Sequence, residues 1–248
     1  WTPYSSKPTY YERADWVIDA MTRPEAEISE LVMWYFEEPD AAMHTYGPES
    51  PEAVGRAEHI DSVLRYFFRE IRRSPVFDRI NFIVTADHET GGLTIGFAGT
   101  DYDTYLDLLE SQKISLAKYD SDYVTAYKEN KTSFEDVLVD IEELFGLKVE
   151  GEEGDKLVLT SYELEQLRTA YEKSINGTSA SPYSQEEYVL YGTYEPLSVT
   201  ITHIINNKSG ISFTSYSHTG LPVAVLAHGV NAEVFNGYYD NTEIYDKL

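Results

Sequence analysis

The chain of 248 residues contains no cysteine. Disulfides and thiolate metal ligands are therefore excluded, while the redox compartment stays undetermined. No apolar run reaches the ~18 residues that span a bilayer, so no membrane-spanning helix is expected. The sequence begins at Trp1 rather than Met and shows no signal-peptide pattern, so we expect a processed or truncated product.

Basic residues are scarce, with 19 Lys and Arg against 43 Asp and Glu and a net charge of -24. Such a surface repels a nucleic acid duplex and an anionic membrane, which argues against both as partners. An anionic small-molecule substrate would need a local positive centre, and a bound metal ion could supply it. The hydrophobic content of 42% is ordinary for a globular protein, and the length allows a full core.

Apolar patterning predicts an α/β fold. Helices are expected at 13–23, 50–74, 101–112, 133–146, 160–174 and 195–210. Buried strands are expected at 30–36, 80–86, 93–98 and 222–228. Because strand, long helix and strand follow each other, a right-handed crossover and a mostly parallel central sheet flanked by helices are predicted. We expect one domain over 1–248, with a helical insertion at about 99–195.

Carboxylates and imidazoles gather where predicted strands end. Asp40 and His44 follow the first strand at a spacing that stacks both side chains on one face of a helical turn. Asp87 and His88 follow the second strand and can serve one site only if the strand stops there, since neighbouring strand residues point to opposite faces. His218 precedes the last strand. Ligands collect at such strand ends, and carboxylates with imidazoles suit catalytic zinc.

Each of these groups also has a plainer interpretation, which stays open at this point. Asp87 and His88 could form a polar turn after a buried strand. Asp40 and His44 could be an exposed pair at a helix start, and a single His218 is more often a loop histidine than a ligand.

Three further histidines are interpreted as structural. His59 lies in mid-helix, His203 lies within an apolar helical stretch, and His228 lies at a strand end without a nearby carboxylate. Glu89 is a candidate for orienting a ligand imidazole from outside the metal site, because metal-bound histidines usually bond to a second group.

The motifs "TADHETGG", "SHTG" and "VFNGYYDNTEI" resemble the metal-site and C-terminal motifs of bacterial alkaline phosphatases. The stretch "YFEEPDAAMHTYGPES" resembles that of nucleotide pyrophosphatase/phosphodiesterases, a sister branch of the alkaline phosphatase superfamily. The resemblance covers nearly the whole chain and implies an alkaline phosphatase-like α/β fold. It leans to the diesterases over residues 1 to about 83 and to the phosphatases from about 84 onward. A composite chain or an intermediate branch is our hypothesis for this change.

The resemblance implies two zinc sites. Asp40, His44 and His218 would hold the zinc that activates water, and Asp87 and His88 would hold the zinc that stabilises the attacking nucleophile. Two metal ions ~3.5–4 Å apart can clamp the attacking and leaving oxygens of an in-line displacement at phosphorus.

Parts of the family pattern have no match in this sequence. Tyr35 stands where the phosphatases carry a magnesium-ligand Glu, so the resemblance does not extend to the magnesium site. The Ser or Thr nucleophile of the family belongs to a region that precedes the residues present here. We therefore expect the C-terminal portion of a catalytic domain, without normal turnover on its own.

The activity implied by the resemblance is hydrolysis of phosphomonoesters through a covalent Ser or Thr phosphate intermediate. The alternative is a nucleotide pyrophosphatase/phosphodiesterase, supported by the first third of the chain and by Tyr35. A non-catalytic metal-binding fragment or composite chain is a hypothesis of a different class. The expected partners are phosphate-ester small molecules, not a nucleic acid duplex or a membrane. A homodimer is left open, and the resemblance implies a periplasmic or extracellular location.

Overall fold

The computed structural model describes residue 5 and residues 7–48, 50–177 and 184–248. The chain divides into two compact units, which are described separately. Unit 1 consists of Trp1–Ala42, Glu49–Glu89 and Leu221–Leu248, and unit 2 consists of Met43–Pro48 and Thr90–Gly220. Unit 2 encloses the helical insertion expected at about 99–195.

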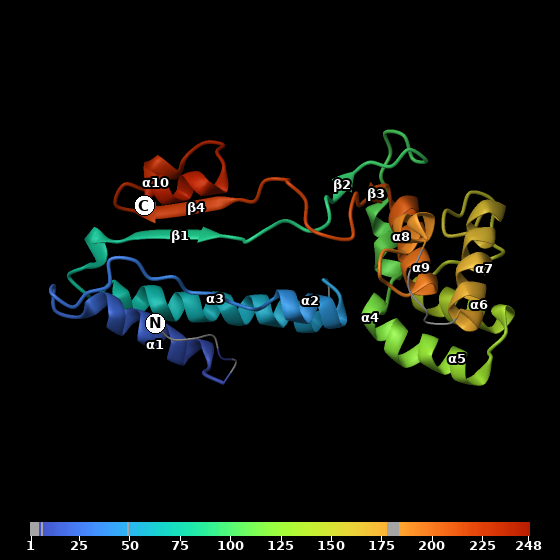
Figure 1. The fold of residues 1–248 in the computed structure, drawn as a ribbon, viewed down its shortest axis with the longest axis horizontal. Coiled ribbons are helices and arrows are strands. Elements are labelled where there is room, and N and C mark those ends of the chain that lie inside the picture. The colour runs from blue at the N-terminus through green and yellow to red at the C-terminus, as the bar shows by residue number, and fades with distance from the viewer. Residues whose placement is uncertain (1–4, 6, 49, 178–183) are drawn as a thin grey trace. The chain divides into compact units, whose positions relative to one another are not determined.

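Unit 1 combines helices α1 (Tyr10–Thr22) and α3 (Pro51–Ile71) with one pair of strands (Figure 1). Helix α1 packs beside the long helix α3. Strand β1 (Asn81–Thr85) pairs with β4 (Val225–Gly229) in antiparallel register. The unit is completed by η1 (Phe77–Arg79), η4 (Ala232–Phe235), η5 (Asn241–Glu243) and α10 (Ile244–Lys247).

Aromatic side chains form much of the core of unit 1. Phe67 of α3 lies 5.6 Å from Trp34 and 5.9 Å from Phe82 of β1, measured between ring centroids. The long helix starts as the sequence predicts, because the Ser50 side chain accepts a hydrogen bond from the Ala53 amide at 3.2 Å. The apolar face of this amphipathic helix packs on α1 and on Phe82 of β1.

In the described part of the chain the strands pair antiparallel, so they do not form the mostly parallel sheet that the sequence predicts. Residues 31–36 are extended but belong to no strand, and their side chains alternate between exposed and half-buried, so only one face packs on unit 1. No described strand lies beside them, and the expected crossover has no first strand. The chain leaves unit 1 after β1 and re-enters it before β4, and these two strands run in opposite directions.

Unit 2 is mainly helical. Its longer helices are α6 (Phe134–Phe145), α7 (Ser161–Asn176) and α9 (Pro196–Ser209). Shorter elements are η2 (Leu106–Ser111), α4 (Leu116–Tyr119), η3 (Asp120–Val124), α5 (Thr125–Asn130) and α8 (Gln185–Tyr191). Strands β2 (Thr94–Ile95) and β3 (Ile211–Ser212) pair antiparallel. Helix α2 (Asp40–Tyr46) crosses the boundary between the units.

Helix α9 lies in the core of unit 2, in contact with α6, α7 and α8. Leu197, Ile201 and Ile205 are fully buried along it. The helix ends at Gly210, whose φ of 79° closes it in the left-handed conformation, as the sequence predicts. The predictions of helices at 133–146 and 160–174 are also confirmed. The helix expected at 101–112 is instead the 3₁₀ helix η2, which starts only at Leu106 after the left-handed Asp101.

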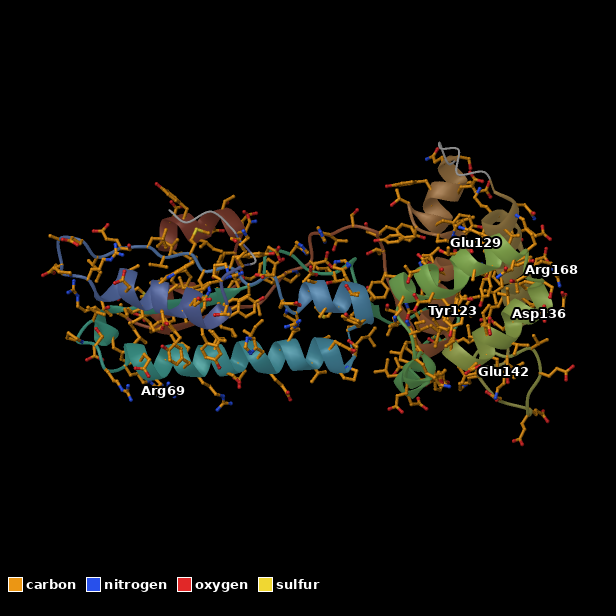
Figure 2. The ribbon with its side chains drawn as sticks, turned by 90° about the horizontal axis from the view of Figure 1, so that it is seen from below. Arg69, Tyr123, Glu129, Asp136, Glu142 and Arg168 are labelled. Carbon is orange, nitrogen blue, oxygen red and sulfur yellow. The ribbon has the colours of Figure 1, made fainter. Side chains whose placement is uncertain are left out.

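The acidic helices of unit 2 present their charges to solvent. Figure 2 shows Glu129, Asp136 and Glu142 on the outside of these helices, and all three are exposed. Arg168 of α7 lies over the ring of Phe134 at 4.4 Å. These charges therefore form a solvated face. Over the residues that the structure covers, no helix is both long and apolar enough to cross a membrane.

Candidate metal centre

Asp87 and His88 come together directly after β1. The strand ends at Thr85, so the two side chains are released from the alternation of a strand. Nε2 of His88 lies 3.5 Å from Oδ2 of Asp87, and the His88 amide donates to Asp87 Oδ1 at 3.1 Å. Nδ1 of His88 donates to the backbone carbonyl of Glu89 at 2.8 Å. This bond leaves Nε2 as the lone-pair nitrogen, the arrangement usual for metal-bound histidines.

The two glycines behind this pair bind the loop that carries His218. Gly91 and Gly92 have φ values of 62° and 69°, which only glycine adopts without strain. The carbonyl of Gly91 accepts hydrogen bonds from the amides of Thr214 at 3.0 Å and Ser215 at 3.1 Å. Pairing of β2 with β3 extends this connection. The residues that follow Asp87 and His88 are thus hydrogen-bonded to the residues that precede His218.

Asp40 begins helix α2, and His44 lies in its last turn. The helical turn expected over these residues is confirmed. Glu38 stabilises the helix start, because its Oε2 accepts a hydrogen bond from the Ala42 amide at 3.0 Å. Arg56 of α3 lies 3.4 Å from the other oxygen of Glu38, so the start of α2 is tied to α3.

A partly buried ion pair supports the segment before Asp40. Arg13 of α1 donates to both carboxylate oxygens of Glu37, at 2.8 and 3.2 Å, and its side chain is 10% exposed. The hydrogen bond from Arg13 lowers the pKa of Glu37 below its usual value. Burial and the Glu37 charge raise the pKa of Tyr10 to about 12. Sequence patterns do not predict this pair, because its members are 24 residues apart in the chain.

The five predicted ligands are divided between the units. Unit 1 contains Asp40, Asp87 and His88, and unit 2 contains His44 and His218. All five are exposed. Within the described part of the chain, no group of three or more His, Asp or Glu side chains that could hold a metal ion is present. The donor types nevertheless fit zinc, and the Asp87–His88 pair has the spacing and the outer hydrogen bond that such a ligand pair needs.

The other histidines lie apart from these motifs in the chain and contact aromatic rings or strands. His59 lies 5.7 Å from the Tyr10 ring in a stacked orientation. His203 is stacked on Tyr216 at 5.7 Å, and burial lowers its pKa. His228 lies opposite Phe82 in the β1–β4 pair. The contact from Glu89 to His88 uses the Glu89 backbone, so a role for the Glu89 carboxylate remains a prediction.

Comparison with known proteins identifies relatives of two kinds. The sequence model of the family described as type I phosphodiesterase/nucleotide pyrophosphatase matches residues 1–210. Over 59 residues the chain is 44% identical to human ectonucleotide pyrophosphatase/phosphodiesterase family member 7, which covers 24% of this chain and 13% of that protein. Over 162 residues it is 28% identical to alkaline phosphatase 3 of Bacillus subtilis (strain 168), which covers 65% of this chain and 28% of that protein.

A solved structure, that of a cold-active alkaline phosphatase from the psychrophile Shewanella sp., matches with a TM-score of 0.48 and 25% identity. The match covers 79% of this chain and 39% of that one. The chain thus spans well under a third of the two curated relatives. The family match runs across residue 84, where the resemblance was expected to change, so one family description holds on both sides of that position. The chain therefore belongs to the type I phosphodiesterase/nucleotide pyrophosphatase family, within the alkaline phosphatase superfamily and its α/β fold.

Proposed function

We propose that this chain is part of a zinc-dependent phosphoric ester hydrolase. The observation that carries the proposal is the pair of donor atoms after β1, with Asp87 Oδ2 and His88 Nε2 at 3.5 Å. Two lone-pair donors this close can bind one ion, and the bond from Nδ1 to the Glu89 carbonyl fixes the ring for that task. When bound, zinc supplies positive charge at the phosphoryl group and lowers the pKa of a bound water.

In this proposal Asp40, His44 and His218 hold a second zinc ion. Helix α2 presents the first two residues at a spacing of four, and Glu38 stabilises the start of that helix. His218 is the third ligand, from the loop that Gly91 binds. The ligands themselves provide two carboxylates and three neutral imidazoles, so the pair of ions keeps a net positive charge in an acidic protein.

We favour phosphodiesters and nucleotide pyrophosphates as the substrates. The support is the family match over residues 1–210, together with Tyr35, which is 61% exposed where the phosphatases carry a magnesium-ligand Glu. Phosphomonoesters, preferred from the sequence, are the second candidate, and the similarity to alkaline phosphatase 3 over 162 residues favours them. We also propose action in the periplasm or outside the cell, supported by the relative that is named an ectoenzyme.

The experiment measures bound zinc and turnover of the full gene product. We expect two zinc ions per chain and faster hydrolysis of the nitrophenyl ester of thymidine monophosphate than of nitrophenyl phosphate. The opposite preference would establish the monoesterase. Zinc without turnover of either ester would support a non-catalytic metal-binding chain, and a protein that binds no zinc would end the proposal.

A further inference from the structure

The loop between β3 and β4 carries His218 and contacts the helices of unit 2 through Tyr216. The hydroxyl of Tyr216 donates to the backbone carbonyl of Leu190 at 2.5 Å, near the end of α8. This bond connects the loop to a helix 26 residues earlier in the chain.

The ring of Tyr216 is held on several sides. A Cβ atom added to Gly192 would lie 2.8 Å from the ring, so the ring rests directly on the backbone that ends α8. His203 of α9 stacks on the ring with centroids 5.7 Å apart, and the ring of Tyr194 lies at 5.8 Å. A side chain enclosed in this way has little freedom to move.

The same loop has a second attachment at Thr214 and Ser215, just before Tyr216. The amides of Thr214 and Ser215 donate to the Gly91 carbonyl, and the Ser215 hydroxyl accepts from the Ser217 amide at 2.9 Å. The backbone just before His218 is therefore defined by one attachment to the "TGG" turn and another to α8 and α9. His218 itself is exposed.

We propose that Tyr216 is a positioning residue for the zinc ligand His218. Its ring and hydroxyl connect the loop to the end of α8 and to α9, so the helices of unit 2 hold the ligand in place. This inference rests on the proposed function for the identity of the ligand. It gives the helices of unit 2 a role in zinc binding, because they restrict the loop that carries the exposed His218 imidazole.

The test compares Tyr216→Phe with Tyr171→Phe. Tyr171 of α7 donates its hydroxyl to the Thr132 carbonyl at 2.6 Å, so this control removes the same kind of bond from the same unit but away from the loop. We expect Tyr216→Phe to weaken zinc binding about tenfold in a chelator competition, because the loop that carries the ligand loses its bond to α8. Tyr171→Phe should bind zinc like the wild type. Unchanged zinc affinity in Tyr216→Phe would overturn the proposal.

A second pair of variants tests the contact between the Tyr216 ring and the end of α8. Gly192→Ala pushes a methyl group against the Tyr216 ring, whereas Gly154→Ala has a similarly strained φ of 88° and nothing within 4 Å. Only Gly192→Ala should weaken zinc binding. If the wild type binds no zinc, the proposed function fails, and amide exchange of residues 213–220 decides the positioning role alone. Tyr216→Phe and Gly192→Ala should accelerate that exchange, and unchanged exchange in both would refute the role.

Discussion

The backbone of Gly92 lies so close to Thr214 that a Cβ atom at position 92 would come within 1.9 Å of the Thr214 hydroxyl oxygen. This approach joins the turn that follows His88 to the loop that precedes His218. The φ of 69° at Gly92 is a second reason for glycine at this position. A close contact and a left-handed backbone at one residue make it sensitive to any side chain.

Gly92→Ala should therefore destabilise unit 2 by about 2 kcal/mol or more, from left-handed strain and the clash with Thr214 together. Chemical denaturation measures the loss. Gly220→Ala is the matched control, because a Cβ atom there meets nothing within 4 Å, and its stability should change little. Equal losses in the two variants would contradict the importance of the Gly92 contact.

Arg13→Lys should cost about 1–2 kcal/mol of stability, although the charge is retained. Arg13 donates to both oxygens of Glu37 and to the Ser5 carbonyl at 2.9 Å, a geometry that a single ammonium group cannot reproduce. The control is Arg65→Lys, because its partner Asp61 is 59% exposed and the exchange should leave the stability nearly unchanged. If both variants lowered the melting temperature by the same amount, the two bonds from Arg13 to Glu37 would add no stability beyond that of an exposed ion pair.

Local signals predicted the helices well but not the sheet. Ser50 and Gly210 define the start of α3 and the end of α9 through bonds to neighbouring residues, so a sequence window contains the information. The run at 30–36 has strand composition, yet a strand also requires a partner. No described strand lies beside it, and the alternating exposure of its side chains shows a single packed face. Pairing is a long-range property that composition cannot supply.

The candidate site shows the same division. Asp87 and His88 were predictable because a strand end and two glycines lie within nine residues, and their side chains do face each other. Arg13 and Tyr216 were not, since their partners lie 24 and 26 residues away in the chain. The contacts of Arg13 and Tyr216 form only in the folded chain. No sequence motif predicts them.

His88→Ala should remove one of the two expected zinc ions, because Asp87 alone cannot replace the missing nitrogen donor. Zinc per chain, measured after dialysis, should fall from about two to about one. His228→Gln is the control, since His228 is exposed on β4 and was not assigned to the site. If His88→Ala kept both ions, this histidine would not be a ligand.

Asp120 in unit 2 is an acidic group whose ionisation is disfavoured by the folded structure. It begins the π-helix η3, and its carboxylate accepts a hydrogen bond from the Ser198 hydroxyl. Glu195 also contacts Ser198, with Oε2 at 3.2 Å from the hydroxyl, so two carboxylates share one donor. Burial above all, with the charge of Glu195, raises the pKa of Asp120 to about 6, although Ser198 and Lys128 act in the opposite direction.

A carboxyl group whose pKa is higher in the folded state than in the unfolded chain stabilises the fold only while it is protonated. The contribution of Asp120 is thus complete below about pH 4 and is lost as the pH rises to about 6. Asp120→Asn should remove this dependence and stabilise the protein by about 1 kcal/mol at pH 7, after allowance for the partial exposure of the side chain. At pH 4 the variant and the wild type should be nearly equal in denaturant titrations. A stability difference that is the same at both pH values would mean that the Asp120 charge is not the cause.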